Sequence, residues 1–335
     1  MPSLNWTVIA NAQLEAGKKS DEETQTTFDN SFRGLPFKRR EVSKDDFEKL
    51  KQRHCWTPTE APTLDNVEMI FVVCDTQDDR SVCGVFALST DDNLFLIEAQ
   101  ELQHLMLTED ERTNINELRK QEAAKTGVEY TPIITVEDML NKEYLVREGK
   151  GIVPTFCLMD RQGHRTGEVQ YFADHHSNVM MYQGAALKES NWKMSDTNKK
   201  LLLATAKHWQ TKLIYQLYTQ KKRDQNYLFF TPEITNEVIK QIVVVKPDNS
   251  KKYGDDPSNW LPENGAQHDW FDVCKMAYLA VDFAIQTMSR KRWRFCQSPA
   301  LKRRWERVVN AENRQKQSSI NTDQILDSKQ KWFKG

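Results

Sequence analysis

Three short apolar runs follow one another between residues 69 and 100, and they constrain the fold more than any other feature. They read MIFVVCD at 69–75, SVCGVFALS at 81–89 and LFLIEAQ at 94–100. Val, Phe and Ile are favoured in strands, and the polar segments DTQDDR and TDDN separate the runs. We therefore expect a three-stranded antiparallel meander whose first strand is buried.

Helical and strand patterns alternate after the meander. A charged helical pattern covers 109–126, and apolar residues recur at helical spacing after Gly163, in 200–220 and in 268–288. Further strands are predicted at 155–160 (TFCLMD), 178–184 (NVMMYQG) and 242–245 (IVVV). This order, with strands first and then alternating elements, predicts an α/β fold with a mixed sheet flanked by helices.

Composition excludes several classes of protein. With 39% apolar and 28% charged residues, the chain can bury a core and still solvate its surface. No window approaches the ~18 consecutive apolar residues of a membrane span, so we predict no membrane contact. The six cysteines form no CxxC pair, which argues against a zinc site and favours a reducing, cytoplasmic compartment.

Four aspartates stand where ordered elements begin or end. Asp75 and Asp160 each close an apolar strand, and Asp269 and Asp272 lie three residues apart at the start of the last predicted helix. A carboxylate at the end of a buried strand is costly unless a cation or a hydrogen-bond donor meets it. Taken singly, each has a simpler reading, because aspartate also forms turns and caps helices.

The set of aspartates favours a metal site. Hard oxygen ligands without His or Cys select Mg²⁺ or Mn²⁺, and two such ions can bracket a scissile phosphate. We expect Asp75, Asp160 and Asp272 to be catalytic metal ligands, with Asp75 bridging two ions. Asp269 ranks fourth, as a ligand or a neighbour of one. This is the chemistry of ribonuclease-H-like nucleases.

Four motifs in sequence order resemble the lambda-type, GpA-like large terminase subunit of tailed bacteriophages. They are FDNSFRGLPF (28–37), EVSKDDFEKLKQR (41–53), VCDTQDDR (73–80) and HDWFDVCKMAYLA (268–280). The resemblance implies that Asp75 matches the aspartate of the family's first strand, Asp160 the acid of a later strand and Asp272 that of the final helix. It also implies a ribonuclease-H-like endonuclease that cuts concatemeric viral DNA during packaging.

The resemblance implies partners and a place of action as well. We expect double-stranded DNA, a terminase small subunit and a portal protein as partners, in the host cytoplasm at the procapsid. The family's ATPase motor has no counterpart here, since no GxxxxGK[ST] phosphate loop occurs. Whether the chain is a fragment or a separately encoded nuclease stays open.

We predict three regions along the chain. Residues 1–66 form a leader and linker, with a helix at 44–54 and a Pro/Thr-rich stretch at 57–66. Residues 67–288 form the nuclease domain, and residues 289–335 a basic C-terminal tail.

Two places could contact DNA phosphates. Lys212 lies on the predicted helix at 200–220, where a solvated helix face is the simpler reading. Residues 290–307 carry eight Arg or Lys and one Glu, and the first cluster comprises Arg290, Lys291, Arg292 and Arg294. The histidines after Asp160 read more simply as helix-face or loop residues. A catalytically silent docking module of the packaging complex remains the alternative to a nuclease.

Overall fold

The computed structural model describes residues 46–162, 165–188, 190–220, 222, 226–247, 260–262 and 266–289. Its main-sheet strands are β1 (Val67–Thr76), β2 (Ser81–Ser89), β3 (Leu94–Leu102), β6 (Cys157–Asp160), β7 (Val179–Gly184), β8 (Trp192–Met194), β9 (Leu201–Ala204) and β10 (Leu228–Phe230). Its helices are α3 (Asp46–His54), α4 (Glu109–Thr126), α5 (Val136–Asn141), α6 (Thr166–His175), α7 (Ala206–Tyr218), α8 (Asn236–Val243) and α9 (Asp269–Ser289). Two small sheets pair β4 (Tyr144–Arg147) with β5 (Lys150–Ile152) and β11 (Val245–Pro247) with β12 (Trp260–Pro262).

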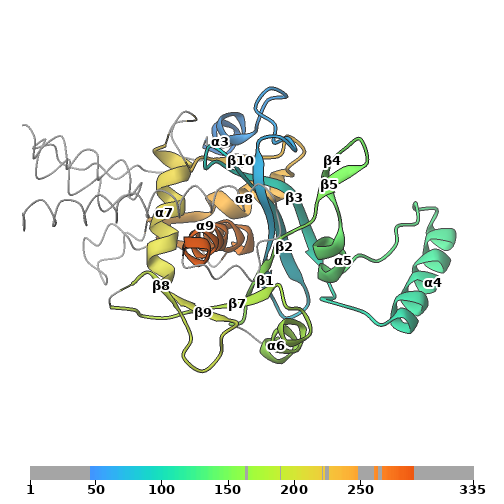
Figure 1. The fold of residues 1–335 in the computed structure, drawn as a ribbon. Coiled ribbons are helices and arrows are strands. Elements are labelled where there is room, and N and C mark those ends of the chain that lie inside the picture. The colour runs from blue at the N-terminus through green and yellow to red at the C-terminus, as the bar shows by residue number, and fades with distance from the viewer. Residues whose placement is uncertain are drawn as a thin grey trace, which may run out of the picture.

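The main sheet runs in the order β10-β3-β2-β1-β6-β7-β9-β8. Strands β1, β2 and β3 form the expected antiparallel meander, and β6, β7 and β9 then extend the sheet in parallel on the other side of β1. Helices cover both faces, with α7, α8 and α9 on one side and α5 and α6 on the other (Figure 1). The predicted ribonuclease-H-like mixed sheet flanked by helices is confirmed.

Strand β1 is the buried centre of this arrangement, with every residue inside the protein. Because side chains alternate across a strand, Phe71 and Val73 enter the core beneath α7 and α9, whereas Val72 and Cys74 enter the core on the side of α5 and α6. The Phe71 ring stacks on Phe156 with centroids 5.5 Å apart, which ties β1 to the segment leading into β6. The sheet is therefore a fixed platform for whatever its strand ends carry.

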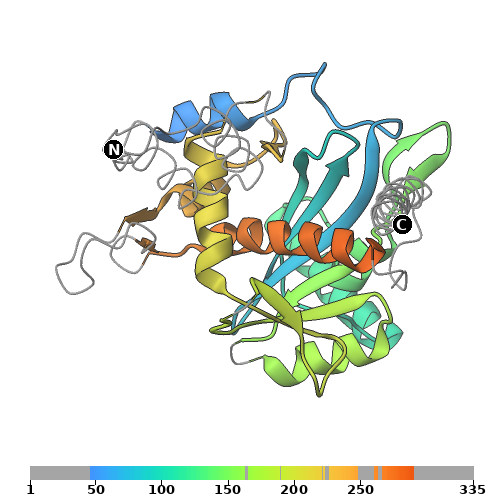
Figure 2. The same cartoon turned by 60° about the vertical axis from the view of Figure 1, so that its left-hand side comes forward.

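Helix α9 crosses the face of the sheet (Figure 2). Its Val273 side chain lies over Gly84 of β2. A Cβ atom at Gly84 of β2 would lie 2.7 Å from Phe86 Cε2, closer than real side chains approach, and 3.0 Å from Val273 Cγ1, tighter than most real contacts. The missing side chain lets α9 approach the strands closely, as expected of a glycine inside a strand. This contact fixes the first turn of α9 above the ends of the central strands.

Two predicted elements were wrong. The segment 200–220 is not one helix, since Leu201–Ala204 form β9 beside β7 and the helix begins at Ala206. Most of the run 242–245 is not a strand, because α8 extends to Val243 and buries Val238, Ile239 and Ile242 on one face. Only Val245, the last residue of the run, belongs to a strand, β11. In both cases a short β-branched or leucine-rich run fits either structure, and the sheet edge or the helix face decides between them.

The predicted division at residues 66 and 288 stays a prediction. Helix α3 falls within the segment predicted to be a linker, and it buries Leu50 and His54. The tail lies outside the described residues. No helix of the described part of the chain combines the length and apolarity needed to cross a bilayer.

Candidate active site

The end of the central strand pair brings Asp75 and Asp160 to the same edge of the sheet. Strands β1 and β6 are parallel neighbours, with Cys74 opposite Met159. The next residue of each strand is an aspartate, Asp75 in β1 and Asp160 in β6. The Thr76 hydroxyl donates to the main-chain oxygen of Asp160 at 2.9 Å and ties the two ends together. The two strands thus fix the two carboxyl groups side by side.

Helix α9 adds two more carboxyl groups from above. Asp269 and Asp272 occupy its first turn, and the contact between Val273 and Gly84 holds that turn against the sheet. Asp75 shares a strand face with Phe71 and Val73, the face that α9 covers. Four acidic groups from three elements therefore meet at one end of the sheet, and they are named the acidic cluster below.

Burial and mutual repulsion perturb this cluster. Asp75 is only 4% exposed, and burial together with the charges of Asp272, Asp160 and Asp269 raises its pKa to about 8. Burial also raises the pKa of Asp160 to about 6, against the opposing hydrogen bond from the Gln162 main chain and the charge of Lys275. Ionisation of Asp75 is therefore unfavourable here unless positive charge lies nearby.

Two basic side chains supply part of that compensation. Lys275 Nζ contacts Asp272 Oδ1 at 2.5 Å, and the nearby negative charge raises the pKa of the Lys275 ammonium although burial opposes it. Arg80 Nη2 donates to Asp269 Oδ2 at 3.1 Å, while its Nε lies 3.3 Å from Glu101. Neither residue was predicted from the sequence. Lys275 had a signal, because it lies three residues after Asp272 and therefore on the same helix face.

Neutral groups hold the carboxylates in place. Gln77 Nε2 donates to Asp75 Oδ2 at 2.8 Å, and the Gln162 main-chain N–H donates to Asp160 Oδ1 at 2.8 Å. The side chain of Gln162 accepts from the Gly184 N–H at 2.9 Å, which links the end of β6 to that of β7. Burial raises the pKa of Tyr182, the residue opposite Asp160 on β7, and the charge of Asp160 adds to this shift.

The donor set suits a hard divalent cation. Carboxylate oxygens are the ligands that Mg²⁺ and Mn²⁺ prefer, and the raised pKa of Asp75 marks a place where added positive charge would be stabilised. Within the described residues, no group of three or more His, Cys, Asp or Glu side chains is arranged to hold an ion as it stands. Lys275 and Arg80 already contact Asp272 and Asp269, so an ion would share or replace those contacts.

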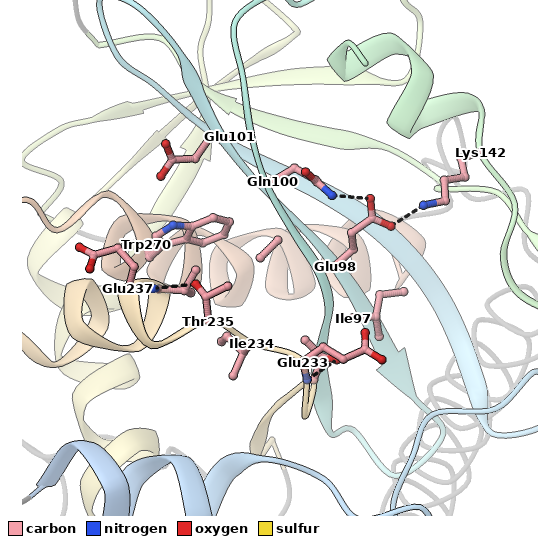
Figure 3. Close-up of a pocket in the computed structure, with 13 residues that line it drawn as sticks. Ile97, Glu98, Gln100, Glu101, Lys142, Glu233, Ile234, Thr235, Glu237 and Trp270 are labelled. Carbon is pink, nitrogen blue, oxygen red and sulfur yellow. Dashed lines mark hydrogen bonds and ion pairs between the residues drawn. The ribbon is translucent and has the colours of Figure 1, made fainter. Parts of the chain in front are cut away.

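An acidic cavity of about 570 Å³ opens between β3 and α8 (Figure 3). Its wall includes Glu98, Glu101, Glu233 and Glu237, with Lys142 bound to Glu98 on one side of β3 and Trp270 on the other. Such a lining repels phosphate groups, so a DNA backbone should not enter there.

The other predicted site residues either lie away from the acidic cluster or fall outside the described residues. Lys212 sits over the rings of Trp209 and Tyr278, 5.3 and 5.5 Å from their centroids, and its contact with DNA stays a prediction. His176, the residue directly after helix α6, contacts the Glu137 carboxylate through its Nε2 at 3.1 Å. The tail residues Arg290, Lys291, Arg292 and Arg294 are outside the described part of the chain.

Comparison with known proteins gives one family. The model of the terminase large subunit gpA endonuclease domain matches residues 2–293. No curated protein and no solved structure matches the chain.

Proposed function

The chain belongs to the family of terminase large subunit gpA endonuclease domains, and from this premise we propose that it hydrolyses DNA phosphodiester bonds with a divalent cation held by the acidic cluster. One observation carries the proposal: the register of β1 and β6 and the first turn of α9 bring the buried Asp75 to one end of the sheet together with Asp160, Asp269 and Asp272. Clusters of buried carboxyl groups with raised pKa values are typical of catalytic sites.

Asp75, Asp160 and Asp272 would hold Mg²⁺ or Mn²⁺, two ions being the expected number, and Asp269 is a fourth candidate. When bound, such ions activate the attacking water and stabilise charge on the leaving oxygen. Asp75 comes from the central strand, between the other two elements, which suits a bridging position.

The other residues keep the cluster ready. With a pKa of about 8, Asp75 carries a proton at pH 7 in the cluster as it stands. Lys275 stabilises the charge of Asp272, and Arg80 that of Asp269, until a cation takes over part of this role. The Lys275 and Arg80 side chains thereby stabilise the four carboxyl groups of the acidic cluster at one buried site.

The biological setting follows from family membership as part of the same proposal. The substrate would be concatemeric double-stranded viral DNA, cut in the host cytoplasm at the procapsid. A terminase small subunit, a portal protein and an ATPase motor are the proposed partners. The basic residues Arg290, Lys291, Arg292 and Arg294 would hold the DNA backbone together with Lys212.

A plasmid-nicking assay tests the activity. The full chain is incubated with supercoiled plasmid and Mg²⁺, Mn²⁺ or chelator, beside Asp75→Ala, Asp272→Asn and the control Asp79→Asn, whose side chain is 77% exposed. We expect cutting that needs the ion, disappears in the first two variants and survives in the control. Intact plasmid in every lane with DNA binding retained would support a docking module instead.

A further inference from the structure

A helical arm leaves the core between β3 and α5. It departs after Leu105 and returns at Val136, where the Val136 N–H donates to the His104 carbonyl at 3.3 Å and the Glu137 N–H donates to the Leu105 carbonyl at 3.0 Å. Helix α4 makes up most of the arm and stands away from the sheet (Figure 1). None of its residues is buried, although a capping box at Thr108 and a left-handed Gly127 define both of its ends.

One face of α4 is used within the chain. Arg112 donates to Asp138 at 2.9 Å, and the Asn116 side chain accepts from the Ile133 N–H at 2.9 Å. Ile115 and Arg119 fall on the same side and are half-buried. The returning segment therefore covers this inner face of the helix.

The opposite face has no cover from the described residues. Glu111, Asn114, Leu118, Gln121 and Lys125 recur at helical spacing, and all are exposed. Leu118 is 64% exposed and lies at the middle of the helix. A single exposed leucine is common on a protein surface. Its central position becomes informative together with the charges around it.

Net charge differs between the two halves of the helix. Residues 109–117 carry four acidic residues and one basic residue, Arg112, whereas residues 118–126 carry Arg119, Lys120 and Lys125 against one acidic residue, Glu122. Two such helices attract each other only when they run antiparallel. DNA would meet the acidic first turn unfavourably, since phosphates repel carboxylates.

We propose that the outer face of α4 binds the same face of a second copy of this chain, antiparallel and related by a two-fold axis through Leu118. In that register the two Leu118 side chains meet, because a two-fold axis pairs a central residue with itself. Glu111 lies seven residues before Leu118 and Lys125 seven after it, so each Glu111 faces Lys125 of the second copy. The Thr108 N–H and hydroxyl already hold the Glu111 carboxylate, at 2.9 and 2.8 Å.

The pairing goes beyond the proposed nuclease activity and does not depend on it. An 18-residue helix is about 27 Å long, so the shared surface is small and belongs to the weak, transient class. We therefore expect dimerisation that depends on protein concentration. Through the bonds at the arm's base, each dimer would carry two acidic clusters.

Sedimentation velocity of the full chain over a concentration series tests the pairing. The wild type should sediment faster as its concentration rises, and Leu118→Glu should remain a monomer because two carboxylates would meet on the axis. Glu129→Lys, a charge reversal on the same arm beyond the helix end, should behave as the wild type. A wild type that stays monomeric throughout, or association that Leu118→Glu leaves unchanged, would overturn the proposal.

Complementary charge reversals then test the register. Glu111→Lys and Lys125→Glu each place like charges opposite each other and should weaken self-association about tenfold. A one-to-one mixture of the two variants restores both opposite-charge pairs and should associate as the wild type does. Circular dichroism checks that each variant keeps its helix. Failure of two folded variants to associate when mixed would refute the antiparallel register.

Discussion

Replacing Asp75 by asparagine should stabilise the protein while removing its proposed activity. Burial of the side chain, together with the charges of Asp272, Asp160 and Asp269, raises its pKa to about 8. In the unfolded chain the same group has its ordinary pKa of 3.8. The folded state therefore binds an extra proton between these two values, and the wild type loses stability as the pH rises from 4 to 8.

The magnitude follows from that difference. At pH 7 the solution lies roughly three pH units above the ordinary pKa, and each unit corresponds to about 1.4 kcal/mol. Ionising the unfolded carboxyl therefore favours unfolding by up to about 4 kcal/mol, a penalty that asparagine does not carry. For a domain of this size such a gain raises Tm by roughly 10 °C.

Thermal and urea unfolding in chelator measure the effect, with Asp75→Asn compared to the wild type at pH 4, 5.5, 7 and 8. The variant should be nearly as stable as the wild type at pH 4 and increasingly more stable above it. Asp79→Asn, in the same turn but exposed, should show no such divergence. The same dependence of stability on pH in the wild type and Asp75→Asn would refute the claim that the folded protein raises the pKa of Asp75.

Three further predictions concern residues around and beyond the acidic cluster. Lys275→Met removes the ammonium group that contacts Asp272, so the free energy of unfolding in chelator should fall by about 3 kcal/mol. Mg²⁺ should then stabilise the variant more than it stabilises the wild type. Tm with and without Mg²⁺ measures the difference, and an equal rise in Tm for both proteins would contradict the prediction. Burial lowers the pKa of His54 from 6.5 to about 4, so the unfolded chain binds an extra proton between these pH values. Up to about 3 kcal/mol of stability should therefore be lost as the pH falls from 6.5 to 4. Urea unfolding of His54→Phe should lack this loss, and the same dependence of stability on pH in variant and wild type would contradict the prediction. Gly84→Val should displace α9 through Val273 and lower the free energy of unfolding by about 1–3 kcal/mol. The rate of plasmid nicking should fall as well. A variant that unfolds at the same urea concentration as the wild type would show that the contact between Gly84 and Val273 is not tight.

Much of the fold could be predicted from its longest apolar runs. The runs that became β1, β2 and β3 are long, rich in β-favouring residues and separated by polar turns, so local pattern and tertiary structure agree. Short segments carried no such information. Leu201–Ala204 could have begun a helix, and their pairing with β7 and β8 makes them a strand. Strand β10 is three residues long and exists through its pairing with β3.

The candidate site divides in the same way. Asp75 and Asp160 stood out because a carboxylate directly after a buried strand needs a partner. Arg80 could not be found, because its contact with Asp269 joins residues far apart in the chain and depends on how α9 crosses the sheet. Local spacing points to groups at the ends of elements, whereas the cations that balance them come from the packing.

Binding of Mn²⁺ to the chain tests the central claim most directly. Electron paramagnetic resonance counts free Mn²⁺ in a titration of the wild type, Asp75→Asn, Asp272→Asn and Asp79→Asn, each shown to be folded. The account predicts saturable binding by the wild type and Asp79→Asn, weakened by tenfold or more in the two cluster variants. Equal binding by all four proteins would mean that the acidic cluster does not hold the ion.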